Sequence, residues 1–159
     1  MKILVVGTIQ KNVINKVENG VTIENKEFFS GDLYTEAKTL AKDNEVVFAC
    51  AIGNEDGFRD LVRKELSDVG AKSVVIKKPM STTTSVTVVD SNGETKNELN
   101  SGATFEFFDI QGLEYVMMNS DLVVYSKNIN DRTKKFLLDI AENRNVNVLK
   151  DVENGAKII

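Results

Sequence analysis

The stretch that indicates the fold most clearly is Val46-Val47-Phe48-Ala49-Cys50-Ala51-Ile52, followed by the polar turn Gly53-Asn54-Glu55-Asp56-Gly57. The unbroken apolar run predicts a strand that is buried on both faces. After the turn, apolar side chains recur on one helical face over residues 57–69, and Gly70 supplies a stop signal. The order of strand, turn and helix is the repeating unit of an α/β fold.

The same unit recurs on both sides of this stretch. Helical periodicity marks residues 32–42 and 131–143, the latter behind Asn130 as a candidate N-cap. Similar short apolar runs predict strands at residues 3–6, 73–76, 122–125 and 146–149. Because strands alternate with helices, the chain is expected to form a mostly parallel sheet with helices packed on its faces.

Two segments interrupt this alternation and predict β-hairpins. Residues 13–29 contain Asn19-Gly20 and residues 82–99 contain Asn92-Gly93, in each case between strand-like stretches. Asn-Gly is the strongest short-range signal for a two-residue hairpin turn. The extra strands are too polar to join the central core, so they predict a small outlying sheet whose exposed edges need to be covered or paired.

Composition places the chain among ordinary globular proteins, with a single domain over residues 1–159. The net charge is -4 and no dense cluster of Lys and Arg occurs, so no nucleic-acid partner is expected. The N-terminus carries neither a secretory signal nor a membrane span. We therefore expect a cytoplasmic protein without a membrane partner.

The absence of histidine excludes several chemistries. Without histidine, Ser-His and Cys-His catalysis are excluded, and the commonest metal ligand is missing. Cys50 is the only cysteine, and its apolar surroundings favour an inert core thiol over a nucleophile. No thiolate cluster can form, and we expect no metal site in this chain.

Phosphate-binding loops are also missing. The pattern Gly-x-Gly occurs nowhere, so the dinucleotide fingerprint and the Walker loop are both absent. The turn at residues 53–57 comes nearest, but its acidic side chains favour a turn with a helix cap over an anion site, and Glu55 with Asp56 rarely suffices for a divalent ion. Asp32, which precedes a helical stretch, is likewise expected to be a helix cap and not a catalytic acid.

Several local patterns, taken in order, resemble the ribokinase, or PfkB, family of carbohydrate kinases. Residues 1–9 are similar to the opening strand and Gly-Ser/Thr-Ile turn of that family, and residues 46–57 to its second strand and acidic turn. Residues 82–94 follow the family's stretch from threonine to Asp-x-x-Gly-Glu, and Gly102-Ala103-Thr104 stands in place of its Gly-Ala-Asn. The resemblance covers nearly all of the chain. It implies a ribokinase-like α/β fold in which the two hairpins form a β lid over the sugar site.

Within this resemblance, the positions that contact sugar have changed. The acidic residue that grips sugar hydroxyls in the family is replaced by Asn12, with Gln10 at the neighbouring polar contact. The family's Gly-Gly-x-Gly-Ala-Asn is replaced by Ser30-Gly31-Asp32-Leu33-Tyr34-Thr35, in which the bulky Leu33 and Tyr34 are expected to fill space meant for sugar. Lys127 falls near a position where ribokinases carry a glutamate that contacts the sugar. The resemblance implies a degenerate substrate site made of Gln10, Asn12, Gly31 and Thr35.

The second half of the family is not represented in these residues. Family members are about twice as long, and their second half carries the anion hole, the catalytic Asp and the nucleotide pocket that phosphoryl transfer requires. The resemblance therefore implies a truncated homologue with no catalytic residue and no cofactor of its own, inactive alone. ATP and Mg would be bound only if a complementing half exists.

Two other hypotheses remain open. One is a non-catalytic ligand-sensing or protein-interaction module that has kept the ribokinase fold. The other is an unrelated flavodoxin-like or Rossmann-like domain, for which the hairpin pair would be unexpected. A homodimer through the lid or an exposed sheet edge is expected, and a small sugar or nucleoside is the expected ligand.

Overall fold

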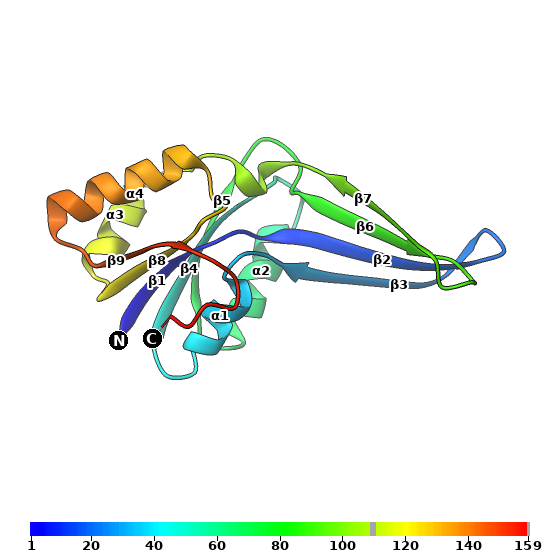
Figure 1. Cartoon of the computed structure of the whole chain (residues 1–159), viewed down its shortest axis with the longest axis horizontal. Helices are drawn as coiled ribbons and strands as arrows, with labels where there is room; N and C mark the ends of the chain where they lie inside the picture. Colours follow the sequence, from blue (N-terminus) through cyan, green and yellow to red (C-terminus); the bar gives the residue numbers. More distant parts are fainter. Residues whose placement is uncertain (109–110, 159) are drawn as a thin grey trace.

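The structure is a computed structural model that describes residues 1–108 and 111–158. Its centre is a five-stranded sheet with the order β5-β4-β1-β8-β9, in which all neighbouring strands are parallel (Figure 1). The strands of this sheet are β1 (Lys2–Val6), β4 (Glu45–Ile52), β5 (Lys72–Lys77), β8 (Leu122–Ser126) and β9 (Val148–Val152). The first four lie where the apolar runs predict them, whereas β9 starts at Val148 and not at residue 146.

Helices cover both faces of this sheet. The helices α1 (Tyr34–Leu40) and α2 (Phe58–Ser67) pack on one face, and α3 (Gln111–Met118) and α4 (Asp131–Arg144) on the other (Figure 1). Asn130 caps α4 as expected, because its side chain accepts a hydrogen bond from the N–H of Arg132 at 2.9 Å. The helix α3 was not predicted from the sequence.

The apolar runs are explained by burial on both faces. Along β4, Phe48 and Cys50 belong to the core beneath α1 and α2, whereas Ala49 and Ala51 belong to the core beneath α3 and α4. Successive side chains of a strand point to opposite faces, so a strand covered on both sides must be apolar at every position. Cys50 is fully buried, and burial raises the pKa of its thiol, as expected for an inert core residue.

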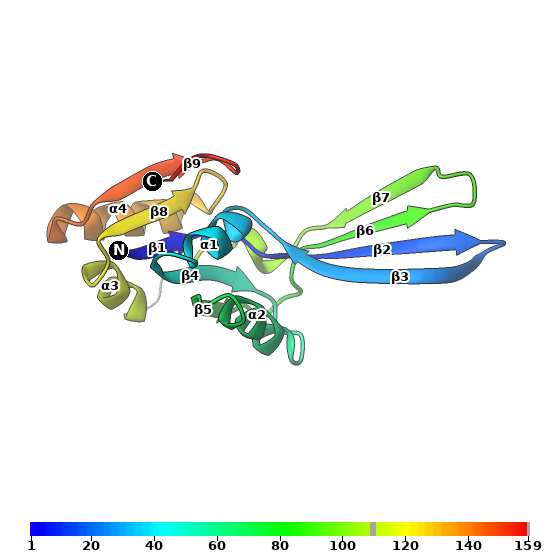
Figure 2. The same cartoon turned by 90° about the horizontal axis from the view of Figure 1, so that it is seen from below.

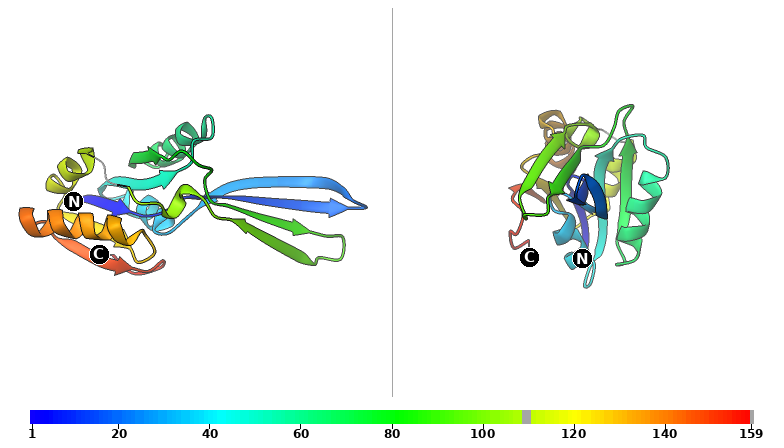
Figure 3. Two further views of the ribbon diagram at one scale, coloured as in Figure 1. Left: turned by 90° about the horizontal axis from the view of Figure 1, so that it is seen from above. Right: turned by 90° about the vertical axis from the view of Figure 1, so that its right-hand side faces the viewer.

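The second sheet projects from one end of the core as a single layer (Figure 2). We call it the lid; it has the order β3-β2-β6-β7 and consists of β2 (Gln10–Glu18), β3 (Val21–Ser30), β6 (Thr84–Val89) and β7 (Thr95–Asn100). Seen along its length, the lid lies in front of the core (Figure 3). Most residues of β3 and all residues of β7 are exposed, so neither lid edge is covered by the described part of the chain.

The two lid hairpins turn in different ways. β2 and β3 are joined by Asn19 and Gly20, both with positive φ (49° and 74°), which is the expected two-residue turn. β6 and β7 are instead joined by residues 90–94, where the Asp90 carboxylate accepts the N–H groups of Asn92 and Glu94 at 2.9 Å each. The prediction of a two-residue turn at Asn92-Gly93 is therefore wrong.

No helix in the described ranges is long and apolar enough to cross a membrane.

Candidate functional site

The lid meets the core in a tightly packed region that we call the root. It is formed around Thr8, Ile9, Gly31, Thr83 and Thr104. A Cβ atom at Gly31 would overlap the carbonyl oxygen of Thr8, so the segments before β2 and after β3 can approach this closely only because residue 31 has no side chain. The buried hydroxyl of Thr104 donates to the carbonyl of Ile9 at 2.7 Å and accepts the N–H of Thr83 at 3.2 Å. Gly31, the glycine that this chain shares with the family's motif, is therefore needed for close packing at the root, independently of any contact with a sugar.

The acidic turn after β4 belongs to this root. The Glu55 carboxylate accepts the N–H and the hydroxyl of Thr82 at 2.7 and 2.9 Å, and Thr82 Oγ1 accepts the N–H of Gly53 at 2.7 Å. The N-cap of α2 is Gly57, with φ 74° and no side-chain hydrogen bond. The expected turn is present, but its acidic residue clamps the lid segment and does not cap the helix.

A cluster of polar side chains lies beside the root, at the carboxyl ends of the parallel strands. We call Asp32, Ser126, Asn128 and Asn154 the carboxyl-end junction. Asp32 Oδ2 accepts Ser126 Oγ and Asn128 Nδ2, both at 2.9 Å, and Asp32 Oδ1 accepts Asn154 Nδ2 at 3.0 Å. Ligands of open α/β sheets bind outside the carboxyl ends of the strands, so the position of this cluster suits a ligand site.

The structure corrects the interpretation of Asp32 as a helix cap. The N-cap of α1 is Leu33, without a side-chain hydrogen bond, and the Asp32 carboxylate points to the loops after β8 and β9. Ser126, Asn128 and Asn154 were missed from the sequence. Their only signal is that each is a polar residue at or soon after the end of a predicted strand.

The predicted site residues are only partly brought together. Gln10 Nε2 donates to Asn12 Oδ1 at 3.0 Å, and Asn12 Nδ2 donates to Ser30 Oγ at 2.7 Å, next to Gly31 at the root. Thr35 lies instead on the exposed face of α1, beside residues 155–158. Gln10, Asn12 and Gly31 thus form one contiguous polar region, and Thr35 faces a different one.

Leu33 and Tyr34 occupy the core beneath α1. Leu33 is fully buried in a left-handed conformation with φ 60°. The Tyr34 ring packs edge-on against Phe48 at 5.6 Å, and its hydroxyl donates to Glu65 at 2.5 Å. Both side chains therefore have core partners. Lys127, which falls near the position of the family's glutamate, forms an ion pair with Glu153.

Charges near the junction are paired. Lys127 Nζ lies 2.6 Å from Glu153 Oε1, which lowers the pKa of Glu153 and raises the pKa of Lys127. Lys134 Nζ lies 3.0 Å from Asp151 and donates to the carbonyl of Lys127 at 2.6 Å. Neither ammonium group is left uncompensated.

The residues present do not fit Mg and ATP. No group of three or more Asp, Glu or Cys residues that could hold a metal occurs among the described residues. The sequence contains no closely spaced glycines to cradle phosphates.

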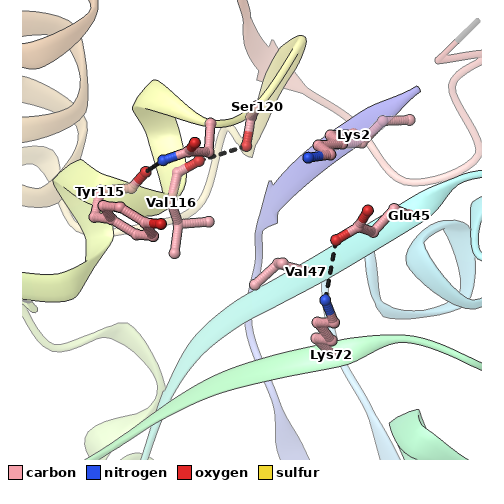
Figure 4. A pocket seen from close by; sticks show the side chains of 9 residues that line it. Lys2, Glu45, Val47, Lys72, Tyr115, Val116 and Ser120 are labelled. Carbon is pink, nitrogen blue, oxygen red and sulfur yellow. Dashed lines mark hydrogen bonds and ion pairs between the residues drawn. The ribbon is translucent and has the colours of Figure 1, made fainter.

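A hollow lies at the opposite, amino end of the sheet (Figure 4). It is a groove of about 310 Å³ between the strands and α3, with Lys2, Glu45 and Tyr115 among its lining residues. Lys72 Nζ pairs with Glu45 at 3.0 Å, which lowers the pKa of that carboxyl. Ligands of open α/β sheets bind outside the carboxyl ends of the strands, so this groove at the amino end is a weaker candidate than the carboxyl-end junction.

Comparison with known proteins places this geometry in a class. No protein-family model and no curated sequence matches the chain. Solved structures do: ribokinase from Arabidopsis thaliana, described as complexed with ribose and ATP, has a TM-score of 0.73 and 17% identity, covering 92% of this chain and 51% of that protein. Ribokinase from Thermotoga maritima has a TM-score of 0.64 and 24% identity, covering 92% and 50%. Fructokinase from Halothermothrix orenii has a TM-score of 0.69 and 13% identity, covering 93% and 56%.

The fold is thus that of the ribokinase-like carbohydrate kinases. The chain spans about half the length of these solved structures. At identities below 25%, the likeness establishes the fold, and it confirms the ribokinase-like α/β architecture predicted from the sequence. The presence of the lid also removes the reason to consider a plain flavodoxin-like or Rossmann-like domain.

Proposed function

We propose that this chain is the acceptor-binding half of a ribokinase-like carbohydrate kinase. The observation that carries the proposal is the shared fold combined with a polar cluster at the carboxyl ends of the strands, beside the root of the lid. Gln10, Asn12 and Gly31 would contact hydroxyl groups of a sugar or nucleoside. Thr35 faces away from these three residues, so it would contact the acceptor only if α1 moved or if the acceptor extended to the exposed face of α1.

The phosphoryl donor would be bound outside these residues. Phosphoryl transfer depends on positioning and on stabilising the charge of the transferred group, and this sequence contains no Gly-x-Gly loop that could stabilise that charge. The 159 residues alone are therefore expected to be inactive. An additional polypeptide segment, in the same protein or another, would supply the binding of ATP and Mg and the general base.

Thermal unfolding with a panel of ligands tests this proposal. A ligand that binds only the folded state raises the unfolding midpoint. Ribose, fructose or adenosine should raise it, and ATP should not. Asn12→Ala should abolish the rise, whereas Asn25→Ala, on the exposed strand β3, should not change it. A rise with ATP alone would contradict the proposal, and so would the absence of a rise with every ligand of the panel.

The second candidate is a non-catalytic interaction module. The observation that favours it is the lid, whose outer strands leave apolar side chains in solvent, with Val21 63% and Leu99 58% exposed. Single-layer sheets with open edges tend to pair with another chain. A homodimer through the lid would cover these edges, whereas pairing along β9 would cover the edge of the central sheet, where Leu149 is exposed. A monomeric mass at micromolar concentration would count against both modes.

A further inference from the structure

We propose that Asp32 restricts the acceptor to uncharged or cationic ligands, such as free sugars, nucleosides or amino sugars, and excludes phosphorylated sugars. This inference rests on the proposed function, because it assumes that the acceptor binds at the carboxyl-end junction. Asp32 was not among the expected site residues. Its role follows from how its carboxylate is held and from the charges around it.

The Asp32 carboxylate is fixed in orientation and retains acceptor capacity. Oδ2 accepts two hydrogen bonds, from Ser126 and Asn128, and Oδ1 accepts one, from Asn154. An ionised carboxylate has about four lone-pair positions, so Oδ1 can accept one further donor. Three partners that are distant in sequence hold the group in place, which is the arrangement expected of a preorganised binding group. A hydroxyl or ammonium group of a ligand is a suitable fourth donor.

The backbone around Asp32 offers no compensating anion site. The N–H of Asp32 donates to Thr8 Oγ1 at 2.8 Å, and the N–H of Leu33 donates to Asn154 Oδ1 at 2.8 Å. The N–H of Tyr34 donates to the carbonyl of Gly31 at 3.4 Å. Phosphate-binding loops work by presenting free, successive N–H groups to the anion. Here these three N–H groups already have acceptors within the protein.

The surrounding side chains add negative charge. The three donors to Asp32 are neutral, so they do not cancel its charge. The ammonium groups of Lys127, after β8, and of Lys134, on α4, already pair with Glu153, Asp151 and Asp131. Together with Asp32, four carboxylates therefore face two ammonium groups. A phosphate dianion placed here would meet repulsion from Asp32, and these two ammonium groups already have carboxylate partners.

Calorimetric titration of the chain with matched ligands tests this inference. Ribose and ribose 5-phosphate differ only in the phosphate, and at low salt we expect the phosphorylated sugar to bind at least about tenfold more weakly. The difference should shrink as salt is raised, because salt screens charge repulsion but not steric exclusion. Glucosamine should bind at least as tightly as glucose.

Three variants assign the effect to the junction. Asp32→Asn removes the charge and should narrow the preference for ribose over its 5-phosphate. Glu153→Gln frees Lys127 at an exposed position and should narrow it as well, so the test stands even if the Asp32 variant is unstable. Asp43→Asn, an exposed acid in the loop between α1 and β4, makes the same change in net charge and should leave the preference unchanged.

The outcomes separate this inference from the proposed function. If neither ribose nor its phosphate binds, the inference fails; if fructose and adenosine do not bind either, the proposed function fails as well. If ribose 5-phosphate binds as tightly as ribose, or if the preference is the same in all three variants and the parent, the inference fails while the proposed function stands. A salt-dependent preference that Asp32→Asn and Glu153→Gln reduce and Asp43→Asn does not would establish it.

Discussion

Leu33 combines two properties that seldom occur in one residue. It is fully buried, and its backbone is left-handed, with φ 60° and ψ 10°. That conformation costs a residue with a side chain about 1–2 kcal/mol relative to the right-handed one. The position tolerates this cost because the leucine fills the core beneath α1 and because Asn154 accepts its N–H.

The backbone strain predicts an unusual order of stabilities. Leu33→Ala should lower the free energy of unfolding by about 2–5 kcal/mol, because it removes a buried side chain and keeps the strain. Leu33→Gly loses the same side chain but relieves the strain, so it should be more stable than the alanine variant by about 1 kcal/mol. Urea unfolding measures both. At Ala37, inside α1, the glycine variant should be less stable than the parent protein, because glycine is a poor helix former. If Leu33→Ala proved more stable than Leu33→Gly, the strain at position 33 would be refuted.

Two buried acids predict a loss of stability in alkali. Burial raises the pKa of the Cys50 thiol above its ordinary 9.0, and burial, followed by the hydrogen bond to Glu65, raises the pKa of Tyr34 above its ordinary 10.0. A raised pKa in the folded state means that the unfolded chain releases its proton first. The stability contribution is therefore complete below pH 9 and is lost as the pH rises.

The slope of this loss is about 1.4 kcal/mol per pH unit for each group. Cys50→Ala should remove the part of this stability loss that begins just above pH 9. Tyr34→Phe should remove the part that begins above pH 10. Tyr115→Phe, at an exposed position, should leave the profile unchanged. Chemical unfolding between pH 7 and 11 is the measurement, and parallel profiles for all four proteins would refute the assignment.

At the scale of elements, the root of the lid depends on hydroxyl groups that have no apolar substitute. Thr82→Val keeps the shape of the side chain but leaves the Glu55 carboxylate and the N–H of Gly53 with one partner fewer. We expect a loss of about 1–3 kcal/mol in the free energy of unfolding. Thr87→Val, within the lid, removes only a hydrogen bond to the exposed Asn97 and should cost little. Equal effects of the two changes on denaturant unfolding would contradict a clamp at the root.

Most elements could be predicted from the sequence because their signals are local. The apolar runs of β1, β4, β5 and β8 and the Asn19-Gly20 turn depend on neighbouring residues alone. The helix α3 was missed because Gly112 near its start is a poor helix former and Val116-Met117-Met118 form an unbroken apolar run that obscures the helical spacing. The β6–β7 connection differs from the prediction because Asp90 closes a longer turn with its side chain.

The carboxyl-end junction could not be predicted for a different reason. Asp32 lies 94, 96 and 122 residues from Ser126, Asn128 and Asn154, and only the order of strands in the sheet brings them together. The resemblance to ribokinases located Gln10, Asn12 and Gly31 near one another. It could not show that the Asp32 side chain forms hydrogen bonds with the ends of β8 and β9 and the loops after them, and does not cap α1.

At the scale of the whole molecule, the lid is the part that most requires a partner. Phe28, Asn12, Ser85 and Leu99 stand opposite one another across the four strands and so share one face. Two of them are apolar and exposed, with Phe28 at 41% and Leu99 at 58%. A second copy packed on this face would cover them together with Asn12.

A lysine in this row should prevent such a dimer. We expect the parent chain to show a dimeric mass by light scattering at micromolar concentration, and Leu99→Lys to show a monomeric mass, because a charge would be buried in an apolar contact. Leu149→Lys, on β9, distinguishes the two modes. If it dissociates the dimer and Leu99→Lys does not, pairing occurs along the sheet edge and not through the lid.

The claim that this chain binds the acceptor of a carbohydrate kinase is tested most directly by amide chemical-shift mapping of the ¹⁵N-labelled protein during titration with ribose. We expect saturable shifts confined to Gln10, Asn12, residues 30–33 and the loops after β8 and β9, with no shifts on addition of ATP. Shifts confined to the groove around Tyr115, or no shifts with ribose, fructose or adenosine, would contradict it.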